Sequence, residues 1–158
     1  LRYLAIVALC LLLGFMLGRK SKYEKRDYLK QFKIGKATYS ESLIYEAYGG
    51  LQNDGIMLAV YYDVDATKIV HQLDSWEKIN DSPTISSILK NVSSYFGLDF
   101  VIPEIASGNF FLYDNSQHKE LCSEAEMNTL LLHSEDVNFS LVVWDDEKHT
   151  IYIVEYRI

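Results

Sequence analysis

Asp63 and Asp65 are the first candidates for chemistry, because a single residue separates them at the end of an apolar run. That run, IMLAVYYD at residues 56–63, predicts a β-strand covered on both faces. An Asp-x-Asp pair can hold Mg²⁺ or Ca²⁺, since these hard cations bind several oxygen atoms. The glycine and distal glutamate of a calcium-binding loop are missing near the pair. Two solvated carboxylates in an acidic chain are the competing interpretation.

Zinc chemistry and thiol chemistry would need histidine and cysteine at suitable spacings. The histidines are His71, His118, His133 and His149. No two of them have the i, i+4 spacing of a zinc-binding helix. Asp114, His118 and Cys122 carry the side chains of a thiol-dependent catalytic triad, but an acidic setting disfavours the reactive thiolate. A buried structural thiol is the simpler interpretation of Cys122.

Signatures of other enzyme classes are missing from the chain. It has no G-x-S-x-G nucleophile motif, no phosphate-binding glycine loop followed by lysine, and no dinucleotide-binding glycine motif. Its two cysteines, Cys10 and Cys122, are too few for a disulfide framework or for a zinc site built on cysteine. We therefore expect no catalytic residue and no cofactor.

Charge divides the chain into three parts. Residues 1–18 have a formal charge of +1, residues 19–36 of +6 and residues 37–158 of −14, which add to the −7 of the whole chain. We therefore expect a transmembrane anchor at 1–18, a basic juxtamembrane helix or linker at 19–36, and an acidic α+β globular domain at 37–158.

The apolar N-terminal run predicts a membrane anchor. Residues 3–18 carry no charge and no proline, and as a helix they would span about 24 Å, against a hydrocarbon core of about 30 Å. A cleaved signal would need a small-x-small site, whereas bulky residues stand before Gly18. We therefore expect an uncleaved single-pass anchor in the lipid bilayer. The lysine and arginine residues that follow it favour a cytoplasmic domain.

The basic segment after the anchor suits a membrane surface, because anionic headgroups attract juxtamembrane lysine and arginine by about 1 kcal/mol each. The residues expected to contact such headgroups are Arg19, Lys20, Lys22, Lys25 and Arg26. A plain stop-transfer signal is the competing interpretation. The acidic domain is expected to prefer a basic protein partner, and no nucleic acid, whose charge it repels.

Periodicity and turn residues predict an α+β fold for the domain. We expect helices at residues 40–50, within 66–79, at 82–97 and at 123–133, and strands at 56–63 and 108–115. Asp54-Gly55 predicts a turn. The terminal run NFSLVVWDDEKHTIYIVEYRI predicts an antiparallel hairpin that turns at residues 145–148. The expected fold is an N-terminal transmembrane helix followed by a small, mostly antiparallel sheet with helices packed on one face.

Two segments carry a resemblance to other proteins. They are EAYGGLQNDG at residues 46–55, which precedes an apolar strand, and NFSLVVWDDEKHTIYIVEYR at residues 138–157. The chain resembles a group of small, uncharacterised, membrane-anchored bacterial proteins with a Tyr-Gly-Gly…Asp-Gly segment near the anchor and a C-terminal β-hairpin. The resemblance implies an architecture and no particular activity.

Together, these patterns favour a single-pass membrane-anchored protein whose acidic α+β domain is a non-enzymatic binding or interaction module. The alternative is a carboxylate-rich domain that binds a divalent cation or performs hydrolysis through Asp54, Asp63 and Asp65.

Overall fold

The computed structural model describes residues 28–49, 54–79, 82–97, 102, 105–121, 124–133 and 137–157. The expected anchor at 1–18 lies outside these ranges, as does the basic segment up to residue 27. Among the described residues, no helix has the length and the apolar character needed to cross a bilayer. The division of the chain into anchor, basic segment and acidic domain stays a prediction.

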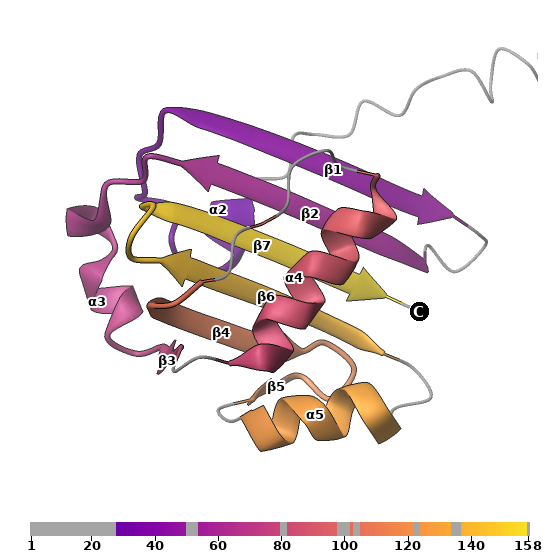
Figure 1. The fold of residues 1–158 in the computed structure, drawn as a ribbon. Coiled ribbons are helices and arrows are strands. Elements are labelled where there is room, and N and C mark those ends of the chain that lie inside the picture. The colour runs from indigo at the N-terminus through magenta and orange to yellow at the C-terminus, as the bar shows by residue number, and fades with distance from the viewer. Residues whose placement is uncertain are drawn as a thin grey trace, which may run out of the picture.

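An antiparallel sheet of seven strands is the centre of the described chain (Figure 1). In chain order its strands are β1 (Glu41–Gly49), β2 (Asp54–Tyr62), β3 (Glu77–Lys78), β4 (Gly108–Asp114), β5 (Lys119–Leu121), β6 (Asn138–Asp145) and β7 (Thr150–Arg157). Their order across the sheet is β1-β2-β7-β6-β4-β3, and β5 also pairs with β4. The strand nearest the C-terminus, β7, therefore lies inside the sheet between β2 and β6. The expected α+β class with a mostly antiparallel sheet is confirmed.

Helices cover both faces of this sheet. The two longer helices, α4 (Pro83–Tyr95) and α5 (Glu124–His133), contribute to the core on one face. The short helices α2 (Tyr28–Gln31) and α3 (Val70–Leu73) contribute to a second core, together with residues around the 3₁₀ turn η1 (Ala66–Lys68). In Figure 1, α4 crosses in front of the sheet and α2 lies behind it. The prediction of helices on one face only is therefore wrong.

The central strands explain why both faces are covered. On β7, Ile151 and Ile153 enter the core beneath α2 and α3, whereas Tyr152 and Val154 enter the core beneath α4. Successive side chains of a strand point to opposite faces, so a strand that is apolar throughout must be buried on both. The same rule applies to β2, where every residue from Met57 to Val60 is fully buried. This confirms the prediction of a doubly covered strand at 56–63.

The predicted helix at residues 40–50 is wrong, since this segment forms strand β1. Leu43, Ile44 and Ala47 have a spacing that fits one face of a helix, which made the helix plausible. In the structure each residue of β1 has a partner on β2. Strand preference depends on such cross-strand packing, and pairing with a buried neighbour overrides the local pattern.

The predicted turn at Asp54-Gly55 is also wrong, because the two residues begin β2 opposite Gly49 and Tyr48. A Cβ atom added to Gly55 would lie 2.2 Å from the carbonyl oxygen of Ala47 and 2.6 Å from ring carbon Cδ1 of Tyr48. Glycine is required here because the Tyr48 ring occupies the space above it, an arrangement known from cross-strand aromatic–glycine pairs.

Other predicted elements are confirmed. The helix within 66–79 is α3, the helix at 82–97 is α4, the strand at 108–115 is β4, and the helix at 123–133 is α5. Ser82 accepts a hydrogen bond of 3.4 Å from a backbone N–H of the first turn of α4, and Gly97 follows the helix with φ of +60°. In the terminal hairpin, the Asp145 carboxylate accepts hydrogen bonds from the N–H groups of Glu147 and Lys148 at 3.0 and 3.1 Å.

Candidate binding site

The carboxylates of Asp63 and Asp65 have local structural partners. Asp63 follows β2 with a positive φ of +51°, and its Oδ2 accepts a hydrogen bond of 2.5 Å from Ser40 Oγ. Asp65 caps η1 and accepts hydrogen bonds from Thr67 N (3.1 Å) and Thr67 Oγ1 (2.6 Å). These bonds from Thr67 lower the pKa of Asp65. Both side chains therefore stabilise the segment that follows β2.

Asp54 does not join this pair, because it begins the nine-residue strand that Asp63 follows, about 30 Å away along the strand. Among the described residues, no group of three or more histidine, cysteine, aspartate or glutamate side chains is placed to hold a metal ion. The metal site at Asp63 and Asp65 stays a prediction. Asp114 is buried and accepts hydrogen bonds from backbone N–H groups of the β4–β5 turn. Cys122 lies outside the described residues.

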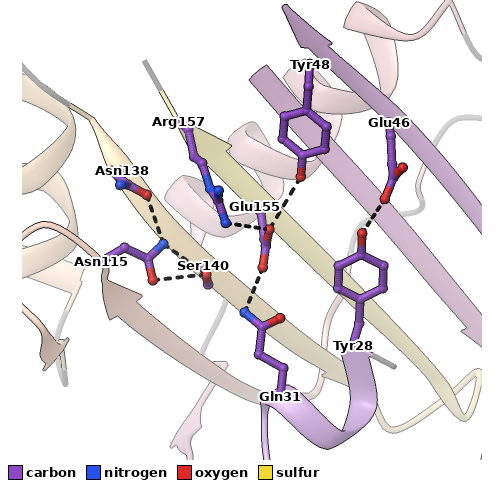
Figure 2. Close-up of polar contacts among 9 residues, drawn as sticks. All are labelled: Tyr28, Gln31, Glu46, Tyr48, Asn115, Asn138, Ser140, Glu155 and Arg157. Carbon is purple, nitrogen blue, oxygen red and sulfur yellow. Dashed lines mark hydrogen bonds and ion pairs between the residues drawn. The ribbon is translucent and has the colours of Figure 1, made fainter. Parts of the chain in front are cut away.

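A network of polar side chains lies instead on the sheet face beneath α2 (Figure 2). The strand register places Glu46 on β1, Glu155 on β7 and Ser140 on β6 in one row across the sheet, with Met57 of β2 between the two glutamates. The next row contains Tyr48, Gly55, Arg157 and Asn138. This end of the face is polar, whereas the rest of the same face is apolar core.

Glu155 is the centre of the network and is fully buried. Its Oε1 accepts a hydrogen bond of 2.8 Å from Gln31 Nε2. Its Oε2 accepts hydrogen bonds of 3.4 Å from the Tyr48 hydroxyl and from Arg157 Nη2, the latter an ion pair. A buried carboxylate is costly unless it is hydrogen-bonded and paired, and these donors from three elements meet that need.

A second contact joins α2 to the other side of the network. The Tyr28 hydroxyl donates a hydrogen bond to Glu46 Oε1, and the tyrosine is only 2 % exposed. Burial, and next the hydrogen bond to Glu46, raise the pKa of Tyr28, so the hydroxyl keeps the proton that it donates. Tyr28 and Gln31, at the two ends of the described part of α2, are thus tied to β1 and β7.

A third group of hydrogen bonds, among three uncharged side chains, lies at the end of β4. Asn115 Nδ2 donates hydrogen bonds to Asn138 Oδ1 (3.0 Å) and to Ser140 Oγ (3.1 Å). The Asn115 backbone N–H donates to the Asn138 carbonyl oxygen at 2.8 Å. These bonds hold Asn115 in place just beyond β4, beside a pocket in the surface.

The pocket has a volume of about 470 Å³ and lies among the end of α2, the end of α3, β4 and β5. Its aromatic lining consists of Phe32, Trp76, Phe111 and Tyr113. The Phe111 ring lies 6.1 Å from the Trp76 ring and 6.4 Å from the Tyr113 ring, nearly parallel to the latter. The three rings form a continuous aromatic wall, which provides apolar contact area in a fixed geometry.

Polar groups complete the lining of the pocket. The amides Gln31, Gln72 and Asn115 are joined by one charge of each sign, Lys33 and Glu120. Both charged residues are exposed, and the described part of the chain shows no ion pair for either. Gln31 is bonded to Glu155, and Asn115 to Asn138 and Ser140, so part-buried hydrogen bonds position two of the lining residues. The arrangement combines an apolar wall with oriented polar groups, as small-molecule sites do.

No family model, curated protein or solved structure matches the chain. The resemblance to small membrane-anchored proteins therefore stays a prediction. The pocket and the network were not predicted from the sequence. One visible signal was Glu155, an acidic residue inside the apolar run TIYIVEYR. A charged residue within a doubly buried strand requires partners from elsewhere in the chain.

Proposed function

We propose that the α+β domain is a non-enzymatic binding module of a single-pass membrane protein, and that the pocket beside α2 is its ligand site. The observation that carries the proposal is the pocket itself, in which an aromatic wall faces amides and two opposite charges. Its volume of about 470 Å³ is within the range of small-molecule sites, about 300–1,000 Å³.

The lining favours a small zwitterion, such as an amino acid or a short peptide. Glu120 offers a carboxylate to an ammonium group, and the aromatic rings near it also attract cations through their faces. Lys33 offers an ammonium group to a carboxylate of the same ligand. The Phe111 and Tyr113 rings offer area for an apolar side chain. Each charged group of such a ligand then has a partner of opposite charge, and its apolar side chain has an apolar contact surface.

The proposed anchor at residues 1–18 places this site near a membrane. Only nine residues, 19–27, separate the proposed anchor from Tyr28, and they reach about 32 Å at most when fully extended. Two described lysines of the basic segment that do not line the pocket, Lys30 and Lys36, are exposed, which supports contact of this segment with anionic headgroups. We propose that the domain faces the cytoplasm on the positive-inside rule.

Fluorine NMR on the full-length chain in detergent tests the ligand site directly. The two tryptophans, labelled as 5-fluorotryptophan, give one reporter in the pocket, Trp76, and one internal control, Trp144, which is buried in the same core but does not line the pocket. A panel of free amino acids and dipeptides should contain a member that shifts the Trp76 resonance saturably and leaves Trp144 unchanged. A panel with no such member refutes the proposed ligand class.

Matched lysine variants test the role of the pocket charges. Lys33→Gln and Lys36→Gln remove the same charge from two exposed residues of one loop, but only Lys33 lines the pocket. Lys33→Gln should weaken binding about tenfold, the loss of one modest charged contact, while Lys36→Gln should leave it unchanged. Equal effects of the two variants would mean that the ligand responds to net charge and not to this site.

The proposed anchor and the cytoplasmic orientation are tested separately. N-terminal sequencing of the chain purified from membranes should give a start before Gly18, and protease added to intact cells should leave the domain uncut. A mature chain that begins after Gly18 refutes the anchor. Digestion from outside refutes the cytoplasmic orientation and leaves the ligand proposal unaffected.

A further inference from the structure

The two edges of the sheet differ strongly. At one edge, β4 is flanked by β3 with two residues and β5 with three. At the other edge, β1 extends over nine residues, and no strand of the described chain pairs with its outer side (Figure 1). A strand edge presents backbone N–H and C=O groups that can pair with another chain.

Natural proteins protect such edges by shortening them, by placing lysine or proline in them, or by interrupting them with bulges. The edge at β3 and β5 follows this rule, because both strands are very short and each contains a lysine, Lys78 or Lys119. Strand β1, ESLIYEAYG, contains neither lysine nor proline. Its register with β2 is unbroken from Glu41 to Gly49, so it contains no bulge. Within the described residues, the long edge therefore lacks the lysine, the proline and the bulge, and its only charges are those of two glutamates.

The side chains of β1 indicate which kind of strand could pair with its outer edge. Leu43, Ile44 and Ala47 are half-buried and offer apolar contact on both faces of the strand. The charges are both acidic: Glu41 and Glu46 are exposed, and no basic residue occurs in the strand. An added strand with apolar residues and with lysine or arginine opposite these glutamates would match the edge in shape and in charge.

We propose that the outer edge of β1 binds an extended, basic segment of a partner protein as an additional strand of the sheet. In this mode backbone hydrogen bonds provide affinity, and the alternating side chains provide specificity. The formal charge of −14 on residues 37–158 adds long-range attraction for such a segment. This binding edge is separate from the ligand pocket, because β2, β7 and β6 lie between β1 and β4 in the sheet.

A second copy of the chain fits this edge less well. In a symmetric antiparallel pair centred on Tyr45, the two Glu46 side chains would be diagonal neighbours on one face, with Cα atoms about 7–8 Å apart. Like charges at that spacing oppose pairing, and each copy would bring another acidic domain. Charge therefore favours a basic partner over self-association.

A synthetic peptide can serve as the partner segment. The probe is a nine-residue peptide of alternating lysine and valine, which matches the length of β1. The controls are the alternating glutamate–valine peptide and a lysine–valine peptide N-methylated at every second residue, which loses the backbone donors of one edge. Fluorescence anisotropy with the full-length chain in detergent measures binding. We expect saturable binding of the lysine peptide, and at least about tenfold weaker binding of both controls.

Two charge-reversal variants locate the site. Glu41→Lys and Glu77→Lys make the same change in charge at exposed positions on opposite edges of the sheet. We expect Glu41→Lys to weaken binding several-fold and Glu77→Lys to leave it nearly unchanged. Equal effects, undiminished binding of the N-methylated peptide, or no binding of the lysine peptide overturns the proposal. A dimer of the free chain that the lysine peptide dissociates, measured by light scattering, shows a second copy on this edge and overturns the proposal.

Discussion

The hydrogen bond from Gln31 to Glu155 should contribute measurably to stability, because it links α2 to a fully buried carboxylate (Figure 2). Hydrogen bonds to charged groups contribute about 1.5–3 kcal/mol when well formed. The bond from Gln31 is 2.8 Å, whereas those from Tyr48 and Arg157 are 3.4 Å, so the first should dominate. Gln31 is exposed and regains water when the bond is lost, which places its contribution below this range, at about 1 kcal/mol.

From these distances we expect Gln31→Ala to lower the free energy of unfolding by about 1 kcal/mol, and Glu155→Gln by about 2 kcal/mol. Glu155→Gln keeps the shape but removes the charge and turns an amide NH₂ towards other donors. The double variant should lose only about 2 kcal/mol, which gives a coupling energy of about 1 kcal/mol. Gln117→Ala is the matched control, since Gln117 is an exposed glutamine in a turn.

Urea unfolding followed by circular dichroism measures all four free energies in one set of conditions. A coupling energy below about 0.3 kcal/mol would refute the reasoning, because the two side chains would then act independently. A loss in Gln117→Ala as large as that in Gln31→Ala would refute it as well. The effect of Gln31→Ala would in that case be common to exposed glutamines and not due to the contact with Glu155.

Three further outcomes are expected. Gly55→Ala should cost about 2–3 kcal/mol because its Cβ collides with β1, whereas Gly97→Ala adds a side chain at φ +60° in open space and should cost only about 1 kcal/mol in urea unfolding. The pKa of Tyr28 is raised in the folded state, so its contribution to stability is complete below about pH 10 and is lost as the pH rises further. Alkaline titration of unfolding should show this fall, with a smaller slope in Tyr28→Phe. Thermal melts with and without Ca²⁺ or Mg²⁺ should coincide under the proposed function. A saturable rise at micromolar metal that Asp63→Asn or Asp65→Asn removes would establish the divalent-cation alternative.

The elements that the sequence predicts correctly have strong local signals. In α4 a capping serine, an N-terminal proline and a closing glycine bracket apolar residues at helical spacing. The hairpin of β6 and β7 combines β-branched and aromatic residues with an acidic turn, and Asp145 caps that turn in the structure. In both cases the interactions that decide the conformation lie within a few residues of one another.

The segment at 40–50, predicted as a helix, shows that local sequence signals do not always decide secondary structure. Leu43, Ile44 and Ala47 match a helical face, and only the neighbouring strand decides in favour of β1. The turn signal at Asp54-Gly55 fails for a related reason, since Gly55 is needed beneath the Tyr48 ring rather than for a turn. Both outcomes depend on cross-strand contacts, which a window of a few residues does not contain.

The candidate site could not be predicted because its parts come from distant segments. Gln31 and Glu155 are 124 residues apart in the chain, and the pocket combines the end of α2 with α3 and the β4–β5 hairpin. Sequence spacing directs attention to Asp63 and Asp65, which are close in the chain, yet each of them serves a local turn. Glu155 was the informative residue, because its position in an apolar strand required donors from other elements.

Gln31, Phe32 and Lys33 form a second wall of the pocket, and the position of this wall depends on how firmly α2 is attached to the sheet. The described turn of α2, Tyr28–Gln31, is held on the sheet by its contacts there. Those contacts are the burial of Tyr28 and Leu29 and the two hydrogen bonds to Glu46 and Glu155. A ligand that touches this wall binds only the attached state of α2 and therefore stabilises it by mass action. Under the proposed function, ligand binding and the hydrogen bonds to Glu46 and Glu155 are coupled through α2, and a change in either should be measurable at the other.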